Sequence, residues 1–152
     1  MTARVVVGIG NPDRGDDAVG RIVASLVQSS VMPDIPVTLL SGEGAGIMAA
    51  LEGVDEAWLV DAARSGASPG TIHRIDCAMD KVPPCGSVSS HDFGLAEAIE
   101  LARALGTLPP QCILYAIEAA DFTLGAPLSP DVVAAAHTVA QRIRQELIRP
   151  PP

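Results

Sequence analysis

Short apolar runs alternate with helical patterns in the first half of the chain. Residues 4–10, 36–40 and 57–60 are mostly aliphatic and have the length of buried strands. Between the first two runs, apolar residues at helical spacing predict one buried helix face, which consists of Val19, Ile22, Val23, Leu26 and Val27. The glycine-rich residues 42–46 lead into a shorter predicted helix with Ile47, Ala50 and Leu51. Each connection is long enough for a helix, so we expect these three strands to be parallel.

The second half of the chain predicts two more strands and two more helices. Residues 70–75 read as a strand that begins only about eight residues after the third one, which is too short a connection for a helical crossover, so we expect it to be antiparallel. An irregular loop over 77–90 follows, and the fifth strand is expected at 112–117. The predicted apolar faces of the two helices are Leu95, Ala98, Ile99, Ala102 and Leu105, and then Val133, Ala136, Ala140, Ile143 and Leu147.

Length and composition favour one globular domain. The chain has 152 residues, of which 48% are apolar and 18% charged, and that is enough to bury a core without a disulfide or structural metal. We expect a single α/β domain over residues 1–149 and a disordered proline tail at 150–152. The three cysteines form no CxxC pair, so free thiols in a reducing cytoplasm are the simplest interpretation.

The charge balance argues against two classes of partner. Ten basic and 18 acidic residues give a net charge of −8, so nucleic acid and anionic membrane surfaces would be repelled. Four aromatic residues are too few for a base-stacking platform. No run approaches the roughly 18 apolar residues that a membrane-spanning helix needs. We therefore expect neither a nucleic-acid nor a membrane partner.

The loop after the first predicted strand carries the first candidate site. Gly8 and Gly10 begin a dinucleotide-like pattern, but Asp13 stands where the third glycine is required, and further acids follow where a pyrophosphate would sit. Asp16 and Asp17 then precede a helix, which is a position typical of helix capping. One acid is enough to cap, so the second leaves a spare carboxylate at the carboxyl end of a strand, where open α/β sheets bind ligands.

Two further residues join this candidate. Asp61 directly follows the third predicted strand, either as a turn residue or as a ligand. If the first three strands lie in the order 2-1-3, Asp17 and Asp61 face the same crevice. His91 opens a helix after a long loop, either as a capping or exposed residue or as a third member of the site. His73 and His137 are assigned structural or surface roles.

No other catalytic pattern competes with these residues. The chain has no G-x-S-x-G turn, no H-E-x-x-H helix, no D-[ST]-G loop and no cysteine in the context of a thiol nucleophile. What remains is Asp17, Asp61 and His91. Two carboxylates and one imidazole suit a borderline metal such as zinc or nickel, with positions left open for water or substrate.

Taken together, these patterns resemble the hydrogenase maturation proteases. The similarity lies in G-x-G-N followed by paired acids and Gly20, then G-x-G-A-G, then Val60-Asp61-Ala62, and finally Ser90-His91 with Gly94 and Leu95. The blocks occur in the family's order over nearly the whole chain. The implied fold is a three-layer α/β structure of the phosphorylase/hydrolase type. Its five-stranded mixed sheet has the order 2-1-3-5-4, approximately, with the fourth strand antiparallel.

The resemblance also implies an activity. Such enzymes are endopeptidases that remove the C-terminal extension of a nickel–iron hydrogenase large-subunit precursor once nickel has been inserted. By resemblance, Asp17, Asp61 and His91 are the metal-binding and catalytic residues. The nickel would be carried by the precursor, and zinc or cadmium could take its place in crystals. Many members carry an acid immediately before the glycine-rich stretch, but this chain has Ser41 there and Glu43 two residues later.

Two alternatives stay open from the sequence. Peptidyl-tRNA hydrolases share the G-x-G-N-P loop, but they need a histidine soon after it and basic residues for tRNA, whereas this chain has no histidine before His73. A non-catalytic nickel-binding assembly factor for hydrogenase would carry the same ligands, because ligands alone do not establish hydrolysis.

Overall fold

Five strands and four helices make up the described part of the chain. The computed structural model describes residues 2–30, 35–82 and 93–148, so His91, Cys85 and the tail 150–152 lie outside the described residues. The strands are β1 (Arg4–Ile9), β2 (Val37–Leu40), β3 (Glu56–Ala63), β4 (Ile72–Asp76) and β5 (Gln111–Glu118). The helices are α1 (Val19–Gln28), α2 (Gly44–Leu51), α3 (Leu95–Leu105) and α4 (Pro130–Ile148), and a 3₁₀ turn, η1 (Gly15–Ala18), precedes α1.

All five strands form one mixed sheet in the order β2-β1-β3-β5-β4, as the sequence predicts. β1 pairs in parallel with β2 and with β3, and β3 pairs in parallel with β5. Only β4 runs antiparallel, against β5. The carboxyl ends of β1, β3 and β5 therefore meet at one edge of the sheet, where a ligand crevice is expected.

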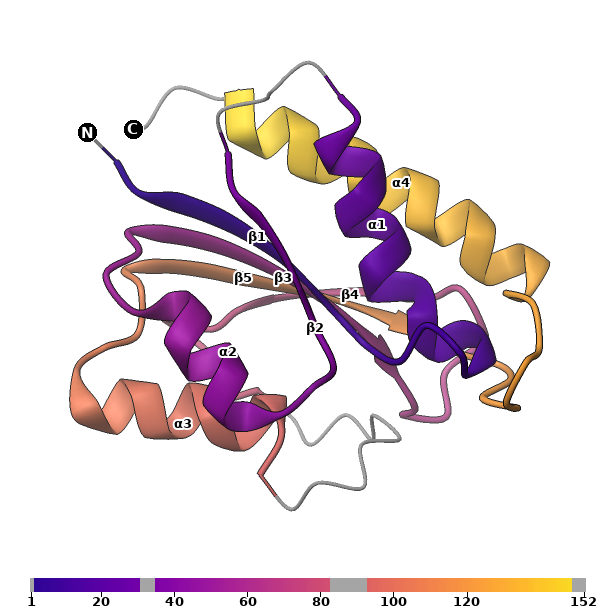
Figure 1. The fold of residues 1–152 in the computed structure, drawn as a ribbon, viewed down its shortest axis with the longest axis horizontal. Coiled ribbons are helices and arrows are strands. Elements are labelled where there is room, and N and C mark those ends of the chain that lie inside the picture. Colours follow the sequence, from indigo (N-terminus) through magenta and orange to yellow (C-terminus); the bar gives the residue numbers. More distant parts are fainter. Residues whose placement is uncertain (1, 31–34, 83–92, 149–152) are drawn as a thin grey trace.

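Helices cover both faces of the sheet, which gives three layers (Figure 1). α1 and α4 pack on one face, over Val6, Trp58 and Tyr115 among others. α2 and α3 pack on the other face, over the strand residues of opposite parity such as Leu59. Because side chains alternate along a strand, Asp61 shares the α2/α3 face with Leu59. No helix in the described ranges is long and apolar enough to span a bilayer.

Glycines allow α1 to lie directly on the strands. A Cβ on Gly20 would stand 2.3 Å from the carbonyl oxygen of Val60 and 2.4 Å from that of Ile9. A Cβ on Gly8 would stand 2.5 Å from the carbonyl oxygen of Gly20. Those separations are shorter than van der Waals contact, so both glycines of the sequence pattern are required by the contact between α1, β1 and β3.

Several predicted details are wrong. β3 does not end before Asp61 but continues to Ala63, because its last residues pair with the end of β5. The glycine-rich stretch is not a lead-in loop, since α2 begins at Gly44. Three residues assigned to buried helical faces are instead exposed, namely Ile22 (41%), Leu105 (62%) and Val133 (41%). Small or neighbouring residues take their places in the core, including Ala24, Val132, Ala135 and Val139.

Replacement of Gly20 by alanine should destabilise the fold strongly. The added Cβ would meet two backbone carbonyls that are fixed in the sheet, and overpacking of this kind costs about 3 kcal/mol in free energy of unfolding. Gly46→Ala is the matched control. Its Cβ would meet only Leu40 Cδ2 at 3.7 Å inside a helix, so it should stabilise by about 0.5–1 kcal/mol. Urea unfolding of both variants measures the difference, and equal stabilities would contradict the packing account.

Candidate active site

Asp17 is held immediately beyond β1. It lies in η1, is 7% exposed, and its Oδ2 accepts a hydrogen bond of 2.9 Å from the backbone N–H of Asn11. Gly10 is required here, because its φ is 145° and a Cβ at this position would stand 1.8 Å from the carbonyl oxygen of Asp17. Burial raises the pKa of Asp17, and this effect outweighs the hydrogen bond from Asn11 and the charge of Arg14.

Asp61 lies in β3, close enough for the charge of Asp17 to act on it. Its side chain is 4% exposed and accepts a hydrogen bond from the backbone N–H of the next residue, Ala62. Burial raises the pKa of Asp61 well above its usual range, and the negative charge of Asp17 raises it further. The structure thus brings together the two acids that the sequence analysis selected. Because Asp61 lies inside a strand, its interpretation as a turn residue is wrong.

Among the described residues, no basic side chain forms an ion pair with these two buried carboxylates. None of the ion pairs between described residues involves Asp17 or Asp61, and the positive charge that acts on Asp17 comes from Arg14, whose side chain is exposed. Buried carboxylates are normally neutralised by protonation, an ion pair or a metal. Their oxygen donors therefore fit a divalent cation. Within the described ranges no group of three potential ligands occurs, and the third candidate, His91, lies outside them.

Asp16, the neighbour of Asp17, has a structural role instead. Its carboxylate accepts hydrogen bonds from the backbone N–H groups of Ala120, Asp121 and Ser129 and from the Ser129 hydroxyl, at 2.7 to 2.9 Å. Burial opposes its ionisation, but these bonds outweigh it and lower the pKa of Asp16. Asp16 thereby fixes the loop from β5 to α4 beside the crevice. The capping interpretation is wrong for both acids, because neither caps η1 or α1.

The start of α2 packs against Phe93. The backbone N–H of Gly44 donates to the carbonyl of Phe93 at 2.9 Å, and a Cβ on Gly44 would collide with the Phe93 ring. Phe93 is the first described residue after His91 in the chain, so this contact fixes the described end of the His91 segment. Ser41 and Glu43 are both exposed beside it. Glu43 directly precedes α2, and its side chain makes no capping hydrogen bond to that helix.

A buried glutamate was missed by the sequence analysis. Glu118, at the end of β5, is 1% exposed and accepts hydrogen bonds from the backbone N–H and hydroxyl of Ser65 and one of 3.0 Å from His73 Nε2. Burial opposes its ionisation, but the bonds from Ser65 and His73 lower the pKa of Glu118. This cluster ties the β3–β4 turn to the sheet, so His73 has the structural role that the sequence analysis assigned to it. The sequence signal that could have revealed it is the single acidic residue, Glu118, at the end of the otherwise uncharged strand β5.

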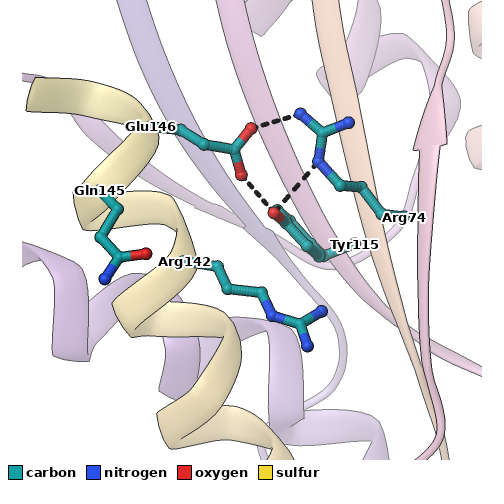
Figure 2. Close-up of a pocket in the computed structure, with 5 residues that line it drawn as sticks. All are labelled: Arg74, Tyr115, Arg142, Gln145 and Glu146. Atoms are coloured by element: carbon teal, nitrogen blue, oxygen red, sulfur yellow. Dashed lines mark hydrogen bonds and ion pairs between the residues drawn. The ribbon is translucent and has the colours of Figure 1, made fainter. Parts of the chain in front are cut away.

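A polar cavity of about 280 Å³ lies on the opposite face of the sheet, next to α4 (Figure 2). Arg74, Tyr115 and Glu146 bond one another there: the guanidinium binds both partners, and the phenol donates to the Glu146 carboxylate. Burial and then the carboxylate of Glu146 raise the pKa of Tyr115 to about 12. Since these groups satisfy one another, the cluster anchors α4 to the sheet and is not a second reactive site.

Comparison with known proteins identifies one family. A family model described as hydrogenase maturation protease matches residues 21–146. The hydrogenase 2 maturation protease of Escherichia coli K12 is 28% identical over 91% of this chain and 87% of its own length. The hydrogenase expression/formation protein HupD of Thiocapsa roseopersicina is 30% identical over 84% of this chain, which spans 60% of HupD.

Solved structures agree with this. The hydrogenase-maturating endopeptidase HybD of E. coli superposes with a TM-score of 0.78 at 27% identity, over 97% of this chain and 92% of HybD. A hydrogenase maturation protease of Thermococcus kodakarensis KOD1 gives a TM-score of 0.68 at 26% identity, over 97% of this chain and 94% of that protein.

The adjacent acids should have opposite effects on stability. Asp16→Asn places an N–H₂ group against backbone donors and should lower the free energy of unfolding by about 2 kcal/mol at pH 7. Asp17→Asn and Asp61→Asn remove carboxylates whose ionisation is disfavoured in the fold, so both should stabilise the metal-free protein at pH 7. Urea unfolding of the three variants in EDTA measures this.

The pH dependence provides the control. Because the pKa of Asp16 is lowered on folding, its contribution is complete above the unfolded value of about 4 and is lost as the pH falls. The pKa values of Asp17 and Asp61 are raised, so their cost should disappear at low pH, where both states hold the proton. Destabilisation by Asp61→Asn at pH 7 would contradict the account.

Proposed function

This chain belongs to the hydrogenase maturation protease family, and we propose that it removes the C-terminal extension of a nickel–iron hydrogenase large-subunit precursor after nickel insertion. It is a peptide hydrolase, like the endopeptidases to which it is similar. The nickel belongs to the substrate in this proposal and is not a resident cofactor. The precursor is therefore recognised by its metal as well as by its peptide.

The observation that carries the proposal is the pair of buried carboxylates without a cation. Asp17 lies in η1, just after β1, and Asp61 lies in β3. Burial disfavours the ionisation of both carboxyl groups, and the charge of Asp17 disfavours that of Asp61 further. A nickel ion presented by the precursor would supply the missing positive charge. Carboxylate oxygens and an imidazole nitrogen are suitable ligands for such an ion.

His91 is the proposed third ligand. Its support is the Ser90-His91 block of the sequence, together with the contact of Phe93, two residues later, with Gly44 at the start of α2. An imidazole in this position would complete a set of one nitrogen and two oxygen donors. Glu43, exposed at the same helix start, is proposed to take over from the acid that many relatives have at the position of Ser41.

The proposed mechanism depends on placement. Contacts from Asp17, Asp61 and His91 to the metal-loaded precursor would hold its scissile peptide bond over the crevice. Misplacement of a reacting group by about 1 Å costs on the order of a hundredfold in rate. Asp61, whose pKa burial raises, is proposed to accept a proton from the attacking water. Its neighbour Asp17 then serves in orientation rather than in proton transfer.

Cleavage should require both nickel in the precursor and the three proposed residues. The wild-type chain should release a C-terminal peptide from nickel-loaded precursor, and the rate should fall by about a hundredfold or more with nickel-free precursor. Asp17→Asn, Asp61→Asn and His91→Ala should be equally inactive on loaded precursor. Mass spectrometry of the released peptide measures each rate, and Glu52→Gln, which changes an exposed acid after α2, is the matched control with unchanged rate.

Two results would overturn parts of this proposal. Equal rates for loaded and nickel-free precursor would refute the recognition of nickel but leave a peptidase in which the two carboxylates activate water. Binding of loaded precursor without release of any peptide would favour the non-catalytic assembly factor.

A further inference from the structure

β2 has an open edge. Because β2 is the outermost strand, only one side of its backbone is paired, through bonds such as Val6 N–H to Pro36 O (3.0 Å) and Gly10 N–H to Leu40 O (2.9 Å). Backbone groups alternate in direction along a strand, so those of Val37 and Leu39 point away from β1. Within residues 2–30, 35–82 and 93–148, no backbone group pairs with them.

The two edges of the sheet differ in character. β4, the other edge strand, carries Arg74 and Asp76, and charged side chains of this kind protect a sheet edge against pairing with another chain. β2 has the sequence Val-Thr-Leu-Leu and no charge. Leu39 is 42% exposed, and Ile22 of α1, the helix that packs on this strand, is exposed to the same degree. The β2 edge therefore retains the features that favour the addition of a strand.

This edge leads directly to the candidate active site. The last backbone bond of β2 joins Leu40 to Gly10, and the next residue, Asn11, binds the carboxylate of Asp17. The guanidinium of Arg21 holds both strand ends, at 3.2 Å from Gly10 O and 3.3 Å from Leu40 O. A strand added beside β2 would lie two strand spacings from β1, about 10 Å, which about three extended residues can cross. From the β4 edge, a route to β1 crosses β4, β5 and β3 instead of β2 alone.

We propose that the outer edge of β2 binds the precursor's C-terminal segment as an added, extended strand. This inference rests on the peptidase function proposed above. A scissile bond must be presented in extended chain, and pairing through backbone groups accepts many sequences while it fixes direction and register. Leu39 and Ile22 offer an apolar surface to alternate side chains of the bound segment. The precursor is thereby held at two points, its metal at the acids and its peptide at β2.

Proline substitution tests the strand edge. Leu39→Pro removes an outward N–H without breaking a bond to β1, and edge strands tolerate proline at such positions. It should raise KM for nickel-loaded precursor by about tenfold while kcat stays within about twofold, since one backbone hydrogen bond is worth about that factor. Leu39→Ala keeps the N–H and should raise KM by about threefold or less. Ile72→Pro, at an outward position of β4, is the matched control and should leave KM unchanged.

Amide hydrogen exchange of the wild-type chain gives a second test of the same proposal, and it does not depend on the folding of a variant. A synthetic peptide that spans the precursor's cleavage site should slow exchange at Val37 and Leu39 by about tenfold at saturation, and N-methylation of alternate peptide residues should abolish the effect. Unchanged exchange at both amides, or an unchanged KM for a folded Leu39→Pro variant, would refute the binding of the precursor at β2. If the wild-type chain still cleaves the precursor in that case, the proposed peptidase function stands. Failure of the wild-type chain to cleave loaded precursor would instead refute the proposed function.

Discussion

The close contact of α1 with β1 and β3 is the constraint on which the rest of the structure depends. Gly20 lies against the carbonyls of Ile9 and Val60, so no side chain separates the helix from the two strands. The residues that follow these carbonyls lead into the site: Asn11 and the η1 turn after β1, and Asp61 after Val60. The packing that joins the first layer to the sheet therefore also places Asp17 beside Asp61. A helix held one side chain further away would separate the two carboxylates.

That placement has a cost in stability, which other acids offset. Burial raises the pKa values of Asp17 and Asp61, so the fold disfavours the charged form of both carboxyl groups. Asp16 and Glu118 are equally buried, but backbone N–H groups and side-chain donors satisfy their carboxylates. Asp16 fixes the loop between β5 and α4, and Glu118 fixes the segment between β3 and β4. The fold thus contains two classes of buried acid. Asp16 and Glu118 stabilise the segments that follow β5 and β3, whereas the ionisation of Asp17 and Asp61 is disfavoured.

The directions of the strands could be predicted from local patterns, because helix-sized connections indicate parallel strands and the short link before β4 indicates an antiparallel one. The order of the strands in the sheet was implied by the family resemblance. The adjacency of Asp17 and Asp61 follows from that order. Helical faces were harder to predict, because small residues such as Ala24 and Ala135 are buried while the larger Ile22 is exposed. Of two adjacent valines, Val132 is buried and Val133 is exposed. The extent of β3 depends on long-range pairing with β5. The contacts of Glu118 with His73 and Ser65 span 45 and 53 residues, and that of Asp16 with Ala120 spans 104, so no local pattern reveals them.

The central claim is that Asp17 and Asp61 form one cation-binding crevice that acts with His91. The most direct test is a crystal of this chain soaked in cadmium, a stand-in for nickel, with diffraction measured near a cadmium absorption edge. The account predicts an anomalous peak within about 2.5 Å of a carboxylate oxygen of both aspartates and of an imidazole nitrogen of His91. Strong cadmium peaks elsewhere on the molecule, with none between Asp17 and Asp61, would contradict it.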